Sequence, residues 1–501
     1  MGSLGRFGVV AIMASACQTL ARAQGPIATV AGDYRVRIEH ASPPRVVVEA
    51  DLQPADGVLL MATGGGIDHL PNQWATFVEG LRATDQRGRA LTLESRGPEG
   101  WRIVTAHTGR VRLTYQVNLS FTTQPWPPGN EQAGVWLDST LYMITKPLFV
   151  ASTVEGPRRV VFSLPAGWRI STPWVPDPQS PGAFLAPTRE ELMENSVVAG
   201  RHREQRFERG PFTLTLALLG DLAAEGEVVA ATLDAVARHV NRVFPQSPPA
   251  RYLVTLFRAH QDDGESFTSS AAFTTATRPT RHNIMLWGNN LAHEVYHIWI
   301  GGPVRGSESG VFEWFDEGFT DYYADLALVQ SGIIEPATFL RKAEKVLGRY
   351  AYWTVAPVFQ RQSMFDASPR RGTNRFGVYD GGWAAAFCLD GLVQEASGNA
   401  RALDDVMRSL HERFALLDHP FSREDFVSVA SQAAGTSLAD FFARHIAGVE
   451  PLPLEACLAR AGLEGAFQRY AGELWIAPSE APSAMQSAIF RRIVEGPPRG
   501  R

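Results

Sequence analysis

The chain has few cysteines and, past its first residues, no long apolar run. Three cysteines among 501 residues are too few for a fold based on disulfides. Cys388 and Cys457 stand between apolar neighbours in segments of helical character, so we expect both to be buried free thiols rather than bridge partners. The absence of apolar runs of about 18 residues excludes a multi-span membrane protein. We expect no transmembrane span.

A strong charge of one sign is missing as well. The chain carries 47 basic and 52 acidic residues, a net charge of −5, and no block of Lys or Arg stands out. A protein that binds nucleic acid through its phosphates needs such a basic patch, so we expect no nucleic-acid partner. Hydrophobic residues make up 45% and charged residues 20%, which is typical of globular proteins. At roughly 150 residues per domain, the length predicts about three domains.

The first residues look like an export signal. Arg6 precedes the apolar stretch 7–16, and Ala21-Arg22-Ala23 has the small-residue pattern of a cleavage site. We therefore expect removal of residues 1–23 and a periplasmic or secreted protein. The alternative is a lipoprotein that carries its lipid on Cys17. Both interpretations take the protein out of the cytoplasm.

The mature chain begins with a long stretch of strand character. Residues 34–39 and 110–117 alternate between polar and apolar side chains, the period of a strand with one buried face. Turn residues separate these segments. We expect residues 24–220 to form an antiparallel, β-rich domain.

The hydrophobic period changes near residue 225. Apolar residues recur at helical spacing up to Phe244, and Pro245 ends the helix. Two strands are expected next, over 251–257 and 282–287. We assign residues 221–335 to an α+β domain.

Helical spacing dominates residues 336–465, which we assign to a helical domain. Residues 466–501 are short of apolar repeats and rich in proline, so we expect a partly ordered tail. The fold class predicted is multidomain α+β.

A metal-binding pattern stands at His293-Glu294-Val295-Tyr296-His297. Residues four apart lie on one face of a helix, so both imidazoles can bind one ion. Glu294 would then lie beside a zinc-bound water and act as its general base. The alternative is a helix that carries two histidines by chance, which about one or two chains in a hundred of this composition would contain.

A second helical segment, 313–323, supplies a third ligand. A catalytic zinc site needs three protein ligands and one position open to water. Glu317 follows His297 after nineteen intervening residues, enough for a loop and a second helix that packs on the first. Asp316 is the rival ligand, which spacing does not exclude. Asp321, one turn beyond Glu317, would accept the outer N–H of a zinc-bound histidine. We expect one Zn²⁺ per chain.

These motifs together resemble the gluzincin zinc metallopeptidases, and most of all the glycyl aminopeptidase family. That family has a His-Glu-x-x-His helix followed by Trp-Phe-x-Glu-Gly-Phe-Thr-x-Tyr-Tyr, matched here by residues 314–323. Similar segments extend from about residue 30 to residue 465. They include 77–82, 101–102, 378–382, 389–390 and 403–407.

The resemblance implies a thermolysin-like catalytic domain and two further site residues. Tyr379 would stabilise the oxyanion that forms when water attacks a peptide carbonyl, and Glu265 would bind the α-ammonium of a substrate. Three features depart from the family pattern; the first two bear on substrate choice, and the third would remove a peptide-docking module. The family's Tyr-x-Lys-Gly lysine is Gly381, its Gly-Leu-Glu-His segment is 263–266 with the His lost, and we expect no C-terminal PDZ-like domain after Gly462.

The function predicted is an exported zinc metallopeptidase, an aminopeptidase that hydrolyses a peptide or protein substrate. The alternatives are an endopeptidase, an inactive peptidase fold that binds peptides, and hydrolysis of a non-peptide bond. Arg305 is a further candidate for contact with a substrate carboxylate. The sequence gives no indication of oligomeric state.

Overall fold

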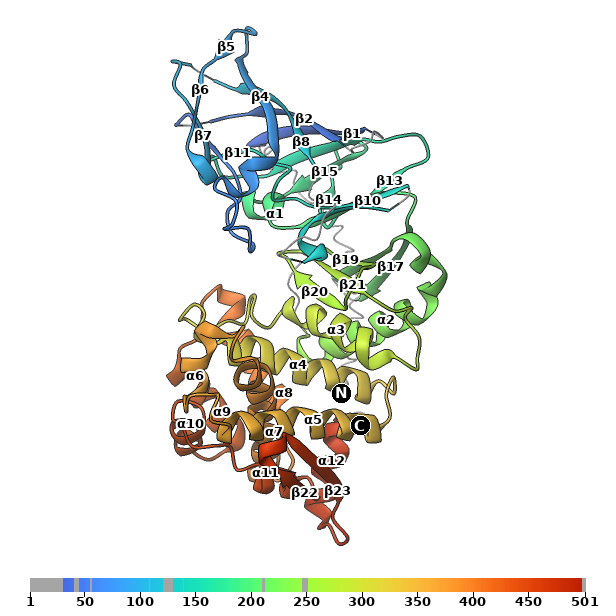
Figure 1. Cartoon of the computed structure of the whole chain (residues 1–501), viewed down its shortest axis with the longest axis vertical. Coiled ribbons are helices and arrows are strands. Elements are labelled where there is room, and N and C mark those ends of the chain that lie inside the picture. Colours follow the sequence, from blue (N-terminus) through green and yellow to red (C-terminus); the bar gives the residue numbers. More distant parts are fainter. Residues whose placement is uncertain are drawn as a thin grey trace, which may run out of the picture.

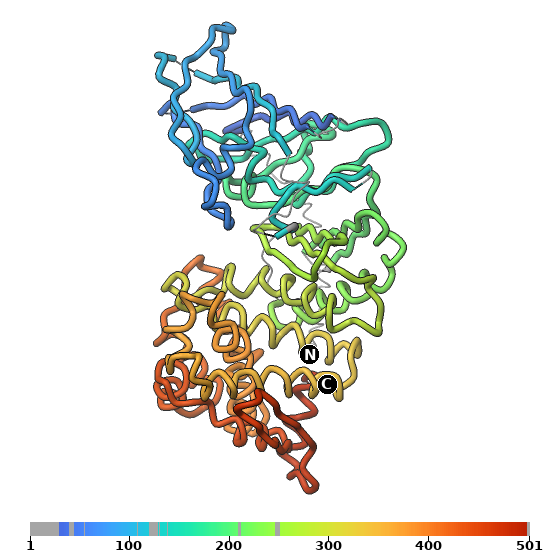
Figure 2. The backbone as a smooth tube through the Cα atoms, in the orientation of Figure 1, coloured from blue at the N-terminus to red at the C-terminus, as the bar shows by residue number. Residues whose placement is uncertain are grey.

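The computed structural model describes residues 30–39, 45–54, 56–107, 109–119, 129–137, 139–209, 212–245 and 251–497. The expected signal peptide 1–23 and Cys17 lie outside these residues. A β-rich domain occupies one end of the elongated molecule and helices the other, with a mixed layer between them (Figure 1). The backbone passes through these three regions in chain order (Figure 2). The predicted multidomain α+β fold is confirmed.

The N-terminal domain is built on an eight-stranded sheet. Its strands are antiparallel, as predicted, except that β1 and β12 run parallel. Burial alternates along β1, where Tyr34, Val36 and Ile38 point into the core. The strand order is β14 (Val175–Pro176), β15 (Ala183–Ala186), β12 (Arg158–Ser163), β1 (Gly32–Glu39), β2 (Arg45–Leu52), β8 (Val111–Asn118), β4 (Val78–Asp85) and β5 (Ala90–Leu91).

Two four-stranded sheets and a short helix complete this domain. The helix is α1 (Arg189–Met193), capped by the side chain of Thr188. One sheet has the order β13 (Arg169–Ser171), β16 (Ser196–Gly200), β10 (Thr140–Ile144) and β9 (Gly134–Leu137). The other has the order β11 (Ala151–Ser152), β3 (Val58–Leu60), β7 (Gly100–Ile103) and β6 (Leu93–Ser95).

A five-stranded sheet forms the middle layer. Its order is β17 (Arg203–Arg209), β18 (Phe212–Leu218), β19 (Arg251–Arg258), β21 (Ser270–Thr275) and β20 (Asp263–Ser266). Because β18 pairs in parallel with β19, the hairpin β17–β18 belongs to this layer. The predicted boundary near residue 220 is therefore too late by one hairpin. Periodicity could not show this, since a strand has the same pattern in either sheet.

Helices α2 (Gly226–Val243) and α3 (Ile284–His297) cover one face of this sheet, and α4 (Glu313–Gln330) packs on α3 (Figure 1). The strand predicted over 282–287 is wrong, because α3 begins at Ile284. Ile284, Trp287 and Leu291 are all buried on this helix. A short apolar run does not by itself distinguish a buried strand from a buried helix.

The sheet has an apolar core on each face. Leu214, Leu216 and Leu218 belong to the core shared with the helices, whereas Ala217 and Leu253 belong to the core of the N-terminal domain. The middle layer is thus held from both sides, and its edge strand β20 is fixed in position relative to both ends of the molecule.

The C-terminal region is mainly helical, as predicted. Residues after 465 are not a loose tail, because they form a hairpin and a helix, and Ile489 and Ile493 of that helix are buried in the core. The elements are α5 (Pro336–Val355), α6 (Met364–Ala367), the π-helical turn η7 (Phe376–Asp380), α7 (Gly381–Ala396), α8 (Leu403–Arg413), α9 (Arg423–Ala434), α10 (Ala439–His445), α11 (Leu454–Arg460), β22 (Leu463–Gln468), β23 (Glu473–Pro478) and α12 (Ala484–Glu495).

Cys388 on α7 and Cys457 on α11 form a disulfide, so the expectation of two free thiols is wrong. The apolar segments around them were correctly assigned to helices, but the two helices pack on each other and bring the cysteines together. No helix in the described part of the chain combines the length and apolarity that a membrane span needs.

Candidate metal centre

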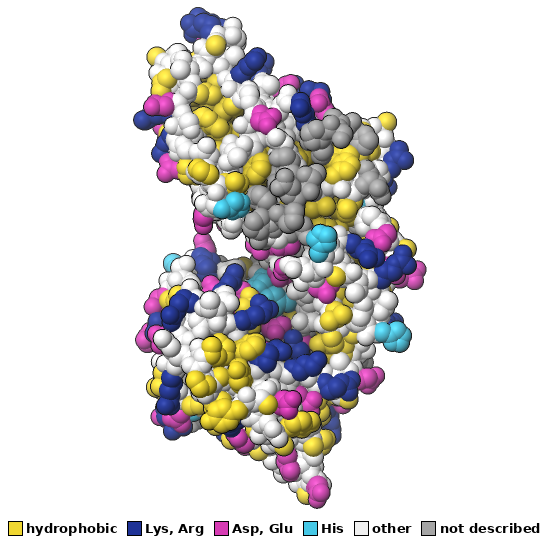
Figure 3. All heavy atoms as spheres, in the orientation of Figure 1, with side chains coloured by type: hydrophobic (Ala, Val, Ile, Leu, Met, Phe, Trp, Pro, Cys, Tyr) yellow, Lys and Arg dark blue, Asp and Glu magenta, His cyan; other side chains and the backbone are white. Residues whose placement is uncertain are grey.

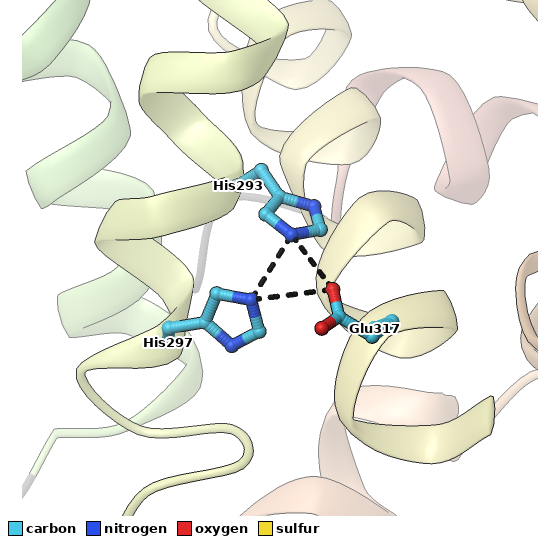
Figure 4. A group of neighbouring side chains, drawn as sticks. All are labelled: His293, His297 and Glu317. Carbon is cyan, nitrogen blue, oxygen red and sulfur yellow. Dashed lines mark hydrogen bonds and ion pairs between the residues drawn. The ribbon is translucent and has the colours of Figure 1, made fainter. Parts of the chain in front are cut away.

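Three side chains from α3 and α4 meet at one point (Figure 4). The Nε2 atoms of His293 and His297 lie 3.0 Å apart. Oε2 of Glu317 lies 3.2 Å from Nε2 of His293 and 3.6 Å from Nε2 of His297. Ligands at zinc distances of about 2.0–2.2 Å in a tetrahedral site lie roughly 3.4 Å from one another. The two imidazoles and the carboxylate therefore fit a zinc ion in both donor type and spacing.

The outer nitrogen of each histidine faces an acceptor. Nδ1 of His297 donates to the carbonyl oxygen of Ile300 at 3.0 Å, and Nδ1 of His293 lies 3.6 Å from Oδ1 of Asp321. Oδ2 of Asp321 lies 3.5 Å from Nζ of Lys342 on α5. Such partners hold a metal-binding imidazole in one orientation and tautomer. Asp321 thus lies where the sequence analysis expected it.

Asp316, the rival ligand, lies on the other side of His297. A Cβ atom added at Gly301 would be 3.3 Å from Cβ of Asp316 and 3.4 Å from Nδ1 of His297, the nitrogen that faces away from the cluster. Burial raises the pKa of Asp316 to about 8. The structure brings Glu317, and not Asp316, to the two Nε2 atoms.

Without an ion, the cluster binds a proton. Burial lowers the pKa of His293, but its hydrogen bonds with Asp321 and Glu317 outweigh burial and raise that pKa to about 10. Burial opposes ionisation of Glu317, yet hydrogen bonds from both histidines hold its pKa well below the ordinary value. A metal ion therefore has to displace a proton from this site, and metal binding weakens as pH falls.

Aromatic packing holds α4 in place. Five aromatic side chains of this helix are buried: Trp314, Phe315, Phe319, Tyr322 and Tyr323. Gly318 crosses Gly382 of α7 so closely that an added Cβ would lie 2.3 Å from Cα of Gly382. Glu317 is next to this crossing, so the helix contact sets the depth at which its carboxylate lies.

Glu294 lies beside the cluster and against the edge strand β20. A Cβ added at Gly264 would be 2.9 Å from Cγ of Glu294. Burial raises the pKa of Glu294, and both histidines of the cluster act in the opposite direction. The carboxylate is therefore a stronger base than an exposed glutamate.

Tyr379 lies on η7, next to the cluster. Its ring is nearly parallel to that of His293, at 17° with centroids 6.3 Å apart, and the guanidinium of Arg375 lies 4.0 Å from its centroid. Burial and the charge of Glu317 raise the pKa of the Tyr379 hydroxyl. The phenol stays protonated and is available as a hydrogen-bond donor.

Glu265 of β20 faces carboxyl and amide groups of the N-terminal domain. Burial and the charge of Glu294 raise the pKa of Glu265 to about 7, while a hydrogen bond with Gln132 lowers it. Burial also raises the pKa of Glu131 to about 7, and Asp263, Glu265 and Glu294 add to this shift. Glu131 was missed by the sequence analysis, because no motif or spacing connects it with β20.

Comparisons with known proteins identify the family. The N-terminal domain model of peptidase M61 matches residues 33–201, and the M61 glycyl aminopeptidase model matches residues 288–378. The chain belongs to the M61 peptidase family. The resemblance inferred from the motifs is confirmed, and the protein is a peptidase. No curated protein matches this chain.

Solved structures similar to this M61 peptidase are aminopeptidases and related enzymes. An aminopeptidase N family protein from Idiomarina loihiensis has a TM-score of 0.71 at 18% identity, over 87% of this chain and 79% of that one. A mutant of the M1 zinc metallopeptidase from Deinococcus radiodurans, bound to Tyr-Ser-Ala, has a TM-score of 0.52 at 17% identity, over 84% and 94%. These likenesses show a shared fold.

The structure shows the surroundings of one departure from the family pattern, Gly381, and of the candidate residue Arg305. A Cβ added at Gly381 would be 3.2 Å from the ring of Tyr350, which lines the position of the missing lysine. Arg305 is paired with Asp418, with Nη2 and Oδ1 2.8 Å apart, so its charge is already matched within the protein.

Proposed function

We propose that this M61 peptidase is an exported zinc aminopeptidase. The observation that carries the proposal is the group of three donor atoms 3.0–3.6 Å apart, from His293, His297 and Glu317. Glu294 lies next to that group, and Glu265 and Glu131 lie beyond Glu294.

The residues around the cluster have distinct roles in this proposal. A zinc ion on the cluster would supply Lewis acidity toward water and toward the peptide carbonyl. Glu294 takes the proton of the attacking water and delivers it to the leaving amine. Tyr379 donates its hydroxyl to the carbonyl oxygen as negative charge develops there. Asp321 orients His293 and does not touch the substrate.

Glu265 and Glu131 make the enzyme an exopeptidase in this proposal. Burial is the main reason why the pKa of each group is about 7, and the charge of Glu265 adds to the shift of Glu131 through repulsion between the two carboxylates. The α-ammonium of a substrate compensates this repulsion, whereas an internal amide of a long chain does not. The site therefore favours a free N-terminus.

Export is part of the proposal. The sequence motif at residues 1–23 is that of a signal peptide. The Cys388–Cys457 disulfide supports the same location, because disulfides persist mainly in oxidising compartments outside the cytoplasm.

Metal analysis together with two variants tests the zinc site. We expect about one zinc per purified chain, loss of both zinc and hydrolysis in His293→Ala, and loss of hydrolysis with zinc retained in Glu294→Gln. Full zinc occupancy in His293→Ala would contradict the ligand assignment. Peptide binding without turnover in the wild-type, zinc-loaded protein would favour a binding protein with a peptidase fold.

A matched pair of peptides tests the aminopeptidase assignment. Acetylation of the N-terminus of a cleaved tripeptide should lower kcat/KM by about 100-fold or more, since the buried carboxyl groups then have no ammonium to pair with. Equal hydrolysis of both peptides would identify an endopeptidase.

A further inference from the structure

A group of arginines lies next to the metal cluster, where Arg371 contacts Glu317. Arg370, Arg371 and Arg375 are exposed and stand in the segment between α6 and η7. Figure 3 shows the surface hollowed between the β-rich and the helical parts, with Lys and Arg side chains gathered on the helical part. In the same orientation, β20, α3 and α4 border this hollow (Figure 1).

Arg375 has no carboxylate partner among the described residues, unlike Arg371, and no side-chain hydrogen bond of the kind that Arg370 makes with Gln362. Arg371 pairs with Glu313 at 2.8 Å and with Glu317, and Arg349 pairs with Asp380 at 2.9 Å. Arg375 instead lies over the ring of Tyr379, 4.0 Å from its centroid. The guanidinium is thus held at the proposed catalytic phenol while its N–H donors are free of protein acids.

Arg371 extends the same positive region towards the cluster. Its Nη1 donates hydrogen bonds to the carboxylates of both Glu313 and Glu317, and about half of its side chain is exposed. The charge of Arg371 also reaches Glu265, whose pKa it lowers. Arg371 therefore lies against Glu317 of the cluster and within electrostatic reach of Glu265.

The carboxyl group of Glu265 and the nearby arginines match the two charged ends of a short peptide, its α-ammonium and its α-carboxylate. One residue spans at most about 3.6 Å of chain, so the α-carboxylate of a dipeptide or tripeptide lies within roughly 4–8 Å of the bond that is cut. Tyr379 contacts the oxygen of that bond in the proposed mechanism, and Arg375 lies on Tyr379. The carboxylate of a longer substrate would pass beyond this place.

We propose that Arg375, assisted by Arg371, binds the C-terminal α-carboxylate of short peptides, so that the enzyme prefers free dipeptides and tripeptides to longer chains. The inference rests on the proposed aminopeptidase function. A planar guanidinium binds a carboxylate through two parallel hydrogen bonds, and stacking on an aromatic ring fixes the plane of the guanidinium. Arg375 is a substrate-binding residue in this proposal and takes no part in proton transfer.

Alanyl-alanine and alanyl-alanine amide provide the test. We expect the wild-type enzyme to prefer the free acid by about tenfold or more in kcat/KM, mainly through KM. Arg375→Gln should lose that preference, so that kcat/KM of the variant is about equal for the free acid and the amide. Arg370→Gln is the matched control, since Arg370 is bonded to Gln362 at 3.0 Å, and it should keep the full preference.

Binding to the Glu294→Gln variant separates this proposal from the proposed function. Calorimetry should show tighter binding of the free acid than of the amide, and Arg375→Gln in that background should remove the difference. Equal binding of acid and amide overturns the carboxylate site even if hydrolysis occurs. A clear binding preference without any hydrolysis by the wild type leaves the carboxylate site standing and overturns the peptidase mechanism.

Two further peptides identify which carboxylate is bound. Alanyl-aspartic acid α-amide, whose only carboxylate is the β-carboxylate of its side chain, should not regain the preference. Hexa-alanine should be hydrolysed with the same kcat/KM as its C-terminal amide. Full recovery by the β-carboxylate would overturn the assignment to the α-carboxylate.

Discussion

Carboxyl groups of the same type take different charge states at this site because their neighbours differ. Glu317 accepts hydrogen bonds from two histidines and has a low pKa, whereas Glu265 faces other carboxylates and has a pKa of about 7. Burial raises the pKa of Glu294, and the two histidines act in the opposite direction. Glu317 therefore stays ionised, while Glu265 and Glu131 can exchange protons near neutral pH.

The pKa of Glu265 predicts the pH dependence of substrate binding. A carboxyl group with a pKa of about 7 is ionised above that pH and neutral below it, so its attraction for an α-ammonium is lost as pH falls through 7. We expect KM for a free peptide to rise below pH 7, and Glu265→Gln to raise KM about tenfold or more at pH 8 and to flatten this rise. Steady-state kinetics between pH 5.5 and 8.5 check both effects. A KM of the wild type that stays constant over this range would contradict the assignment.

Asp321 and Asp316 offer a matched pair of substitutions at the metal site. Asp321 faces Nδ1 of His293, and we expect Asp321→Asn to weaken zinc binding by about 10–100-fold. Asp316 has a pKa of about 8 and is mostly neutral at pH 7, so Asp316→Asn changes little and should leave zinc affinity within about threefold. Competition with a chelator measures both affinities. A large loss in Asp316→Asn would support the rival ligand.

At the scale of elements, the close crossing of α4 and α7 decides where Glu317 lies. Two glycines, Gly318 and Gly382, allow backbones to touch at this point. A Cβ at position 382 would be 1.8 Å from the carbonyl oxygen of Trp314, so no side chain fits without moving a helix.

Alanine substitutions on α7 test the importance of this crossing. We expect Gly382→Ala to destabilise the protein by about 1–3 kcal/mol or more and to weaken zinc binding, since α4 must shift. Gly391→Ala on the same helix is the control: its Cβ would be 3.6 Å from the nearest atom, and removing a helical glycine should be neutral or stabilise by up to about 1 kcal/mol. Denaturant unfolding and zinc titration measure both. Normal zinc affinity in Gly382→Ala would show that α4 tolerates the shift.

The sequence predicted helices and strands correctly where the periodic pattern of apolar residues extends over many residues. The helix predicted up to Phe244, the helical segment 313–323 and the alternating strands over 34–39 and 110–117 are confirmed as α2, α4, β1 and β8. The prediction failed over 282–287, where six residues were taken as a strand although α3 begins at Ile284. A run of six apolar and polar residues fits the period of a strand as well as that of a helix. Packing against the sheet favours the helix here.

At the scale of the whole molecule, a disulfide and a sheet with two cores connect the regions. The bridge joins residues separated by 69 positions, α7 to α11. The hairpin β22–β23 follows α11 directly, and its residue Ile476 donates its N–H to Glu344 of α5 at 2.8 Å. The last residues are therefore part of the helical region that carries Tyr379.

Reduction of the disulfide should destabilise this region. Closing a loop of this length stabilises a protein by about 2–5 kcal/mol, which corresponds to a decrease of roughly 5–15 °C in the unfolding midpoint on reduction. Thermal unfolding with and without a reductant measures the change. The variant with Cys388→Ala and Cys457→Ala should have the lower midpoint in both conditions. Two titratable thiols in the unreduced, unfolded wild type would contradict the bridge.

The sequence by itself determined the parts of this protein that depend on short spacing along the chain. The interval of four between His293 and His297 places both on one face of α3. Glu317 and Asp321 are likewise four residues apart and share one face of α4. Only the tertiary structure decided that Glu131 lies near Glu265, that Cys388 meets Cys457, and that Arg375 stands free on Tyr379. Glu131 and Glu265, like the two cysteines, come from elements far apart in the chain, and no periodicity connects them. Arg375 is near Tyr379 in sequence, but whether its charge finds a partner depends on every element packed around it.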